Sequence, residues 1–530
     1  MYRVPSFILL CAGLALASSP GEAKRDADEL RYNMYTATDN QDAVVNSPAS
    51  DLEFTLSGGN PYPHPFMTDR LGTNGPLLLS GVNLIEHLSH FVRERVPERT
   101  VHAKGAGAHG YFEVTTELGA KYSMADVFSG VGKKTPVTAR MSTIAGNLGN
   151  PDSVRDLRGL AFKLRTKQGI LDWVWLNHPV FWLRDPVKFP HFIHSQKRHP
   201  QTYVTNYNDF WDYLSSNPES IHQTLRAMSD LGTPYGFRHM NGYSGNTFRA
   251  VKEDGSWHYL KITALADQGV RNNTLAEAIA QGGENPDFGV TDLYDAIAAG
   301  DYPSWTVYFQ VMTPSEAEKF KYNIFDLTKE WLPEDVPLQE IGRITLNQNP
   351  TNYFAEVEQV GFDPAQMPPG LEATEDPTLQ ARLFAYGDAQ RYRIGINHKQ
   401  LPVNCPLNPV ANFLRDGAMA FNNQGSRPNY HSTLDPIKLP IRYYNDDNHT
   451  IWVGGAVKFL SQPSEIDFDQ ARGFWHRLSK RDQDHLVSNV IAHLGLATNM
   501  EIRKKQVKLF THVNEKLGKR IAKGVNVTIS

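Results

Sequence analysis

Strand-type segments dominate residues 76–345 of this 530-residue chain, and no other feature restricts its possible folds as strongly. The stretches GYFEVT, LAFKLRT and SWTVYFQVM combine β-branched and aromatic residues in partial alternation, between Gly, Pro and Asp. Helical patterns interrupt them near Asp209 to Met228. We therefore expect an α+β chain built on one large antiparallel sheet that closes into a barrel.

The flanking segments have other patterns. The segment before the strands is polar and rich in Asp, Asn, Gly and Pro, which is typical of an arm without a core of its own. The segment after them holds many prolines and asparagines, and only one short helix is expected, near Ala381. Leu486, Val490 and Leu494 then recur at helical spacing. The predicted parts are a signal peptide (1–23), an N-terminal arm (24–75), the barrel domain with helical insertions (76–345), a wrapping segment (346–463), a C-terminal helical domain (464–517) and a tail (518–530).

The first residues, MYRVPSFILLCAGLALASSPGEAK, have the three parts of a secretory signal. Arg3 precedes an apolar run from Phe7 to Ala17, which is shorter than the roughly 20 residues of a membrane span. We expect a secreted protein or one in the lumen of the secretory pathway, with no membrane span. Glycosylation sequons agree with this route and stand at Asn272, Asn448 and Asn526.

The charge balance excludes a polyanionic partner. Lys and Arg number 53 and Asp and Glu number 57, which gives a net charge of −4 and no field for nucleic acid. The motifs of P-loop, dinucleotide-binding and zinc-protease sites do not occur in the sequence.

Three other stretches carry candidate chemistry. RERVPERTVHAKGAGAHGYFEVT places a histidine before small residues that would let a flat, bulky group approach the backbone. DWVWLNHPVFWLRDP places Asn177 among aromatic residues, and ARLFAYGDAQRYR places Arg382 one helical turn before Tyr386. A guanidinium beside a phenol favours the phenol's anion. Each of these residues taken singly is usually an ordinary polar residue without a functional role. Their combination in one chain favours a functional site over that interpretation.

The sequence resembles the monofunctional haem catalases of the small-subunit type, from about Gly75 to about Leu517. VPERTVHAKGAGAHGYFEVT, FIHSQKR, HMNGY, YPSWTVYFQVMT, NYFAEVEQ, MPPG, RLFAY and PVNCP occur in that family's order. The resemblance implies a homotetramer that disproportionates hydrogen peroxide to water and dioxygen through an oxo-ferryl intermediate, and so protects against oxidative stress.

The same resemblance implies a role for each residue of a haem pocket. Tyr386 would be the proximal ligand of the iron, with Arg382 stabilising its anion. His102 would move the peroxide proton, Asn177 would orient the peroxide, and Ser142 would support His102. The cofactor would be haem b. The other implied contacts are propionate-binding arginines and an apolar lining of the distal side and access channel: Arg99, Arg140, Arg393, Val101, Phe181 and Phe189.

The chain departs from the family at a surface pocket that binds NADPH in some members. Leu231 and Leu265 stand where the NADPH-binding type carries basic residues, Pro333 replaces a histidine, and Arg226 replaces an aromatic residue. NADPH binding is therefore expected to be weak or absent. Four matching positions are kept, namely His222, Ser229, Asn241 and Trp331.

Two departures fall near the proximal side. Asp376 matches the family's network around the arginine, but Asn246 replaces a histidine there, and Gln390 replaces a histidine common in the small-subunit type.

Two alternatives stay open. A lyase of the allene oxide synthase kind would act on a fatty-acid hydroperoxide, but such enzymes place threonine before the distal histidine, where this chain has Val101. A non-catalytic haem-binding or structural protein would be expected to lose His102, Asn177 or Tyr386, and all three are present.

Overall fold

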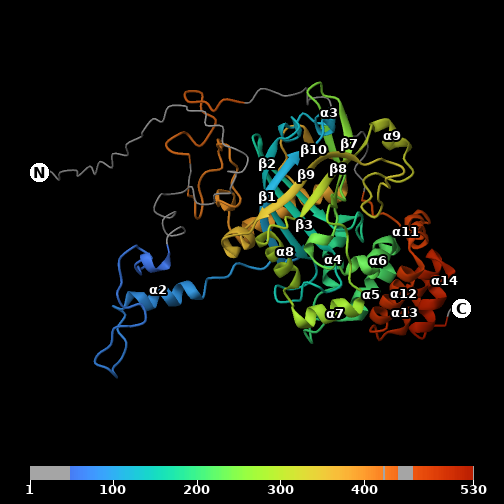
Figure 1. Ribbon diagram of the computed structural model, residues 1–530, viewed down its shortest axis with the longest axis horizontal. Helices are drawn as coiled ribbons and strands as arrows, with labels where there is room; N and C mark the ends of the chain where they lie inside the picture. Colours follow the sequence, from blue (N-terminus) through green and yellow to red (C-terminus); the bar gives the residue numbers. More distant parts are fainter. Residues whose placement is uncertain (1–47, 422–423, 440–457, 529–530) are drawn as a thin grey trace, which may run out of the picture. The chain divides into compact units, whose positions relative to one another are not determined.

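The computed structural model describes residues 48–421, 424–439 and 458–528, and its centre is a closed antiparallel barrel (Figure 1). Eight of the ten strands form the ring, in the order β7, β5, β4, β3, β2, β1, β9, β8, which closes because β8 also pairs with β7. The short strands β6 and β10 extend from β7. The expected fold class is confirmed. The strands are β1 (Gly105–Val114), β2 (Lys134–Thr143), β3 (Arg158–Thr166), β4 (Gly169–Leu176), β5 (Gly242–Tyr243), β6 (Phe248–Val251), β7 (Trp257–Ala266), β8 (Ser304–Met312), β9 (Gln339–Gln348) and β10 (Leu371–Ala373).

Large aromatic side chains fill the barrel. Phe112, Phe162 and Trp305 are fully buried, and Trp173 stacks on Trp175 with 4.9 Å between ring centroids. Offset and edge-on ring pairs of this kind stabilise a core beyond the contribution of the apolar area that each ring buries. The barrel is therefore a solid core, and sites for ligands lie at its ends or outside it.

A second hydrophobic core lies between helices from two distant segments. Helices α5 and α6, which follow β4 in the chain, pack against α11 and α13 near the C-terminus. Trp211 and Phe510 are buried in this core. The helical insertions of the barrel segment thus share the core of the C-terminal domain. The helices are α2 (Val82–Phe91), α3 (Leu118–Tyr122), α4 (Phe189–His194), α5 (Tyr207–Ser216), α6 (Ile221–Met228), α7 (Leu275–Glu284), α8 (Phe288–Ala298), α9 (Pro314–Lys319), α10 (Pro377–Arg393), α11 (Ile466–Arg477), α12 (Lys480–Leu494), α13 (Met500–Val513) and α14 (Glu515–Gly524).

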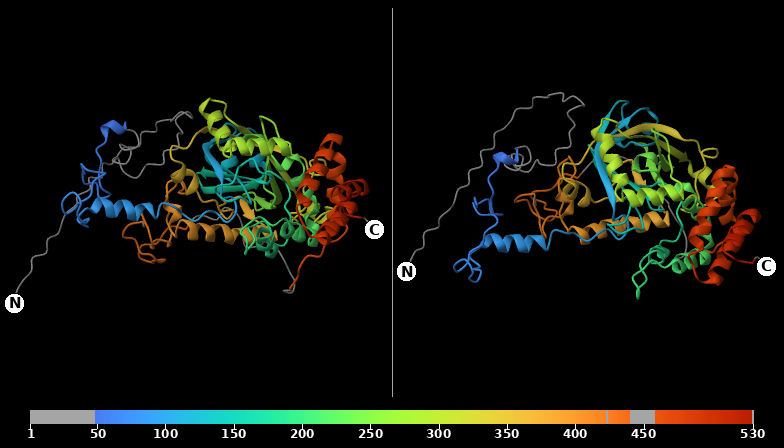
Figure 2. Two further views of the ribbon diagram at one scale, coloured as in Figure 1. Left: turned by 90° about the horizontal axis from the view of Figure 1, so that it is seen from below. Right: turned by 60° about the horizontal axis from the view of Figure 1, so that its bottom comes forward.

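Several boundaries differ from those expected. The helix near Ala381 is α10, with 17 residues, and it lies along one edge of the barrel (orange in Figure 2). Asp376 caps it and Pro377 opens it, two signals of a helix start. Its apolar residues do not form one stripe, so its length was not visible in the pattern.

The final helix occupies much of the predicted tail. Helix α14 runs on to Gly524, and Leu517 and Ile521 are fully buried. Gly518 permits this packing, since a Cβ there would lie 2.1 Å from Thr511 Oγ1.

The described part of the expected N-terminal arm is residues 48–75. Residues 48–75 contain a short 3-10 turn and isolated β-bridges, and Phe66 and Met67 are largely exposed. The expected signal peptide and the sequon at Asn448 lie outside the described residues, whereas Asn526 is exposed and Asn272 is half-buried. Among the described residues, no helix is long and apolar enough to cross a membrane.

Candidate functional site

His102 lies in the loop before β1 and is held from three directions. Its Nδ1 is 2.9 Å from Ser142 Oγ in β2. Its backbone N–H donates to Ile144 O at 3.0 Å, and its carbonyl accepts from Arg140 at 2.8 Å. Its φ of 67° is uncommon for a residue other than glycine. Strain of this kind persists only where the surroundings impose it, so these contacts fix the ring.

The His102 imidazole is neutral at ordinary pH. Burial lowers its pKa to about 3, and the positive charges of Arg140 and Arg99 add to this effect. Arg382, on α10, acts on it in the same direction. The ring is therefore a base that lies in a positive environment close to α10.

Asn177 follows β4 directly and is 9% exposed. Its Oδ1 accepts from the backbone N–H of Arg158 at 2.8 Å, and the backbone N–H of Asn177 donates to Arg158 O at 2.9 Å. This pairing leaves the Nδ2 amide as the donor that Asn177 can offer a ligand.

Two of the three residues expected to line the distal side and the access channel contact each other. Phe181 is buried and stacks on Phe189 at 6.2 Å, and Phe189 is 38% exposed. Val101 packs against the second core cluster, to which Phe181 also belongs. The aromatic pair thus runs from the interior to the surface.

Arg382 and Tyr386 meet on one face of α10, as their spacing predicts. Arg382 Nη2 donates to the Tyr386 hydroxyl at 3.2 Å, and also to Val174 O in β4 at 2.8 Å. Val174 is three residues before Asn177, so the two halves of the candidate site join through one strand.

Asn246 takes part in the network behind Arg382. Its Oδ1 accepts from Arg382, and its Nδ2 donates to Asp376 Oδ2 at 2.9 Å and to Thr378 Oγ1 at 2.7 Å. The asparagine thus bridges the Asp376 carboxylate and the Arg382 guanidinium.

Three buried arginines gather around one carboxylate. Arg99 and Arg393 lie 3.4 and 3.0 Å from Glu358 Oε1, and burial together with Arg140 and Arg393 holds the pKa of Arg99 well below its usual value. Gln390 Oε1 accepts from Arg393 at 3.0 Å. Three arginines with one carboxylate leave an excess of positive charge away from water, and an anionic ligand would compensate it.

The small residues before GYFEVT have a role other than the expected one. A Cβ on Gly105 would lie 2.3 Å from Met141 O, and one on Gly107 would lie 2.5 Å from Val357. These glycines therefore admit neighbouring protein segments.

Sequence reasoning missed the roles of Glu358 and Gly159. Glu358 ends a π-helical turn, Phe354–Glu358, that carries it to the arginines, and no local pattern indicates that turn. Gly159 pairs with Ser142 across two strands and lies behind His102. Only the strand register reveals it.

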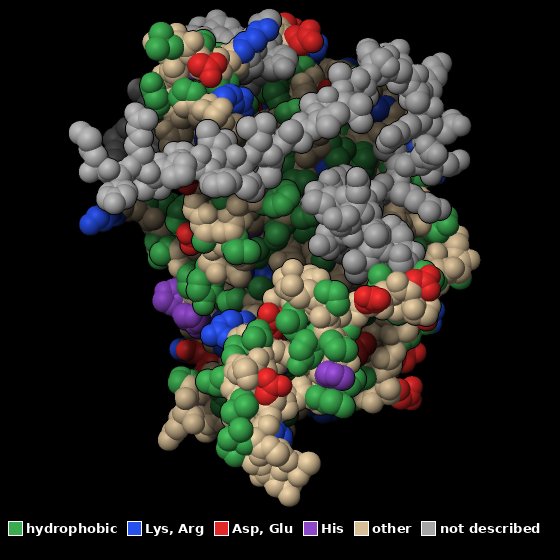
Figure 3. Space-filling model, turned by 90° about the vertical axis from the view of Figure 1, so that its left-hand side faces the viewer, with side chains coloured by type: hydrophobic (Ala, Val, Ile, Leu, Met, Phe, Trp, Pro, Cys, Tyr) green, Lys and Arg blue, Asp and Glu red, His purple; other side chains and the backbone are tan. Residues whose placement is uncertain are grey.

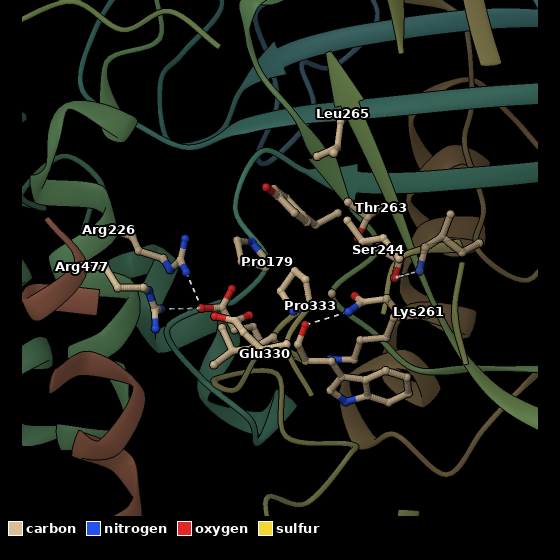
Figure 4. A pocket seen from close by; sticks show the side chains of 17 residues that line it. Pro179, Arg226, Ser244, Lys261, Thr263, Leu265, Glu330, Pro333 and Arg477 are labelled. Atoms are coloured by element: carbon tan, nitrogen blue, oxygen red, sulfur yellow. Dashed lines mark hydrogen bonds and ion pairs between the residues drawn. The ribbon is translucent and has the colours of Figure 1, made fainter. Parts of the chain in front are cut away.

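The residues expected around NADPH lie close together but bind one another. Arg226 Nε donates to His222 at 3.0 Å, and its Nη2 pairs with Glu330. Leu265, Trp331 and Pro333 line a cavity beside this pair (Figure 4).

A closed antiparallel barrel, a half-buried imidazole and a tyrosine–arginine pair are together the parts expected of a haem-dependent oxidoreductase. The chain belongs to the catalase family, enzymes that disproportionate hydrogen peroxide and thereby protect against oxidative damage. A family model described as Catalase matches residues 55–435, and one described as Catalase-related immune-responsive matches residues 461–525.

Relatives match along most of the chain. Catalase of Schizosaccharomyces pombe is 49% identical, over 90% of this chain and 93% of that protein. Peroxisomal catalase of Candida albicans is 47% identical, over 89% and 98% respectively. The solved structure of catalase A from Saccharomyces cerevisiae has a TM-score of 0.87 at 43% identity, covering 90% of this chain and 100% of that one.

The residues present fit haem, the cofactor that the family implies. Arg140 Nε is buried and makes no hydrogen bond within the described part of the chain, so a donor is left for an incoming carboxylate. A phenol hydroxyl beside a guanidinium is a ligand suited to ferric iron.

Proposed function

We propose that this catalase binds haem b and that the Tyr386 oxygen would hold the iron. Arg382, 3.2 Å away, stabilises the phenolate, and Asn246 and Asp376 hold the guanidinium in place. Arg99, Arg140 and Arg393 bind the propionates. Haem supplies the redox chemistry when bound, and the protein residues supply binding, orientation and proton transfer.

His102 is the proposed proton carrier. Because its ring is neutral, its Nε2 takes a proton from one oxygen of hydrogen peroxide and returns it to the other oxygen, so that the O–O bond breaks heterolytically. Ser142 holds Nδ1 and thereby aims Nε2. The Asn177 amide orients the peroxide, and Phe181 and Phe189 line the apolar entry.

The fixed imidazole carries this proposal, and replacing it provides the test. His102→Ala should bind haem fully and lose most oxygen release, measured with an oxygen electrode and normalised to haem absorbance. His476→Ala, on an exposed face of α11, should match the wild type. Near-normal oxygen release by His102→Ala would reject the role, while Tyr386→Phe should lose haem or shift its visible spectrum.

We also propose that the protein carries little or no NADPH. Leu231 and Leu265 offer no charge, and Arg226 is already paired with Glu330, so a polyanion finds few cations here. Heat-denatured supernatant should release far less than one NADPH per subunit. About one equivalent, or micromolar binding in physiological salt, would contradict this.

Secretion and assembly complete the proposal. The basic and apolar N-terminal residues favour entry to the secretory pathway, and N-terminal sequencing should place the mature start between Ala17 and Lys24. A mature chain that retains Arg3 would reject this route.

A homotetramer of the small-subunit type would cover apolar side chains that one chain leaves open. Ile85, Leu88 and Phe91 of α2 and Phe384 and Tyr392 of α10 are exposed, and Figure 3 shows further hydrophobic groups (green) on one face. Light scattering should give four times the subunit mass, and a monomer would contradict this assembly.

A further inference from the structure

A cavity of about 360 Å³ lies between β7, the segment after α9 and the helical domain (Figure 4). Lys261 and Leu265 come from β7, Glu330 and Trp331 from the segment after α9, and Arg477 from α11. A volume of this size suits a compact organic ligand with a few rings. The cavity is separate from the residues placed around haem.

Lys261 is a buried cation that lines this cavity. It is 6% exposed, and its ammonium makes no hydrogen bond or ion pair within the described residues. Its Nζ lies 5.2 Å from the centre of the Trp331 ring, a cation–π contact that leaves its N–H donors unused. Burial lowers its pKa to about 8, and the more distant Asp376, Asp326 and Glu330 oppose this shift. The ammonium is therefore charged at neutral pH and lacks an anion.

The remaining charges at the cavity are largely paired. Glu330 binds Arg226 and lies 3.6 Å from Arg477, and Glu334 is exposed beside them. A ligand with several phosphates would meet these two carboxylates but only one unpaired cation. A single negative charge needs only that one cation.

The rest of the lining is mostly apolar. Leu265, Leu332 and Leu338 line it, together with Trp331. An apolar ligand body would bury its surface against them, which supplies most of the binding in sites of this kind.

We propose that this cavity binds a small amphiphilic monocarboxylate, with its carboxylate on Lys261 and a flat apolar body against Trp331 and Leu265. Nothing in peroxide disproportionation requires such a ligand, so this inference goes beyond the proposed function and stands or falls separately from it. The proposed ligand also differs from a dinucleotide in charge and in size.

The test is calorimetric titration of the haem-loaded enzyme with 2-naphthoate and with its neutral analogue 2-naphthamide. One molecule of naphthoate should bind per subunit. The Soret band should not shift, because this site is separate from the iron. Lys261→Met, which keeps the length of the side chain, should weaken the binding of naphthoate about tenfold to hundredfold and leave the binding of the amide unchanged. Lys252→Met, at the turn before β7, is the matched control and should bind like the wild type.

Several outcomes would overturn the proposal. They are no naphthoate binding at millimolar concentration, equal binding of acid and amide, or naphthoate binding that Lys261→Met leaves intact. NADPH that displaces naphthoate at micromolar concentration would instead identify a nucleotide site. Lys261→Met should also retain normal oxygen release and thermal stability, which excludes misfolding as the cause of lost binding.

Discussion

A methyl group added at Gly159 should displace the His102 ring and lower the activity of the enzyme. Gly159 lies in β3, directly opposite Ser142 of β2. A Cβ there would lie 2.7 Å from His102 Nδ1, 2.8 Å from His102 Cε1 and 2.8 Å from Ser142 Oγ. Both partners of the His102–Ser142 hydrogen bond would have to move.

The size of the effect follows from these distances. Nδ1 must move from 2.7 Å to at least 3.4 Å, a shift of about 0.7 Å, to reach an ordinary contact. A misplacement of about 1 Å at a reacting group can cost about a hundredfold in rate. Weakening of the His102–Ser142 hydrogen bond adds a cost of about 0.5–1.5 kcal/mol to the catalytic arrangement. We expect Gly159→Ala to lower kcat/KM for hydrogen peroxide by about tenfold to a hundredfold.

Initial rates of oxygen release over a range of peroxide concentrations, divided by haem content, measure this loss. Gly149→Ala is the matched control, because its Cβ would meet nothing within 4 Å. In Ser142→Ala/Gly159→Ala one clashing atom is gone, so the two losses should be less than additive. A Gly159→Ala enzyme with full haem and a rate within threefold of wild type would refute the proposed geometry.

Two further predictions concern stability. Asn246→Leu removes bonds to Arg382 and Asp376, at a cost of about 3–5 kcal/mol, and should lower the urea midpoint at which the Soret band is lost, whereas an unchanged midpoint would contradict the network. Burial lowers the pKa of His178 to about 3 and of His493 to about 4, so their contribution to stability is complete above about pH 6.5 and declines as pH falls towards those values, by about 1.4 kcal/mol per pH unit for each histidine. Urea unfolding between pH 4 and 7 should show this slope, and His493→Gln should reduce it.

The elements that sequence reasoning found are those with local signals. Alternating β-branched and aromatic residues indicated the strands, and four-residue spacing placed Arg382 beside Tyr386, as the 3.2 Å contact confirms. Residues whose position depends on tertiary structure left no such signal. Gly159 acts through strand register, and Glu358 reaches the arginines through a π-helical turn. Helix α14 was missed because glycines interrupt its pattern, although Gly518 is what lets it pack.

Asn246 gives the network behind Arg382 a bridging group that does not titrate. An imidazole gains a proton near pH 6.5, whereas an amide does not titrate. The Asn246 amide accepts from Arg382 through Oδ1 and donates to Asp376 through Nδ2, so it links the two groups. Asp376 also accepts from Thr378 and Leu379 N–H groups at the start of α10, so the bridge is anchored to the helix that carries Tyr386. The orientation of Arg382 against Tyr386 therefore depends on helix capping and one neutral amide, and weak acid cannot switch it through position 246.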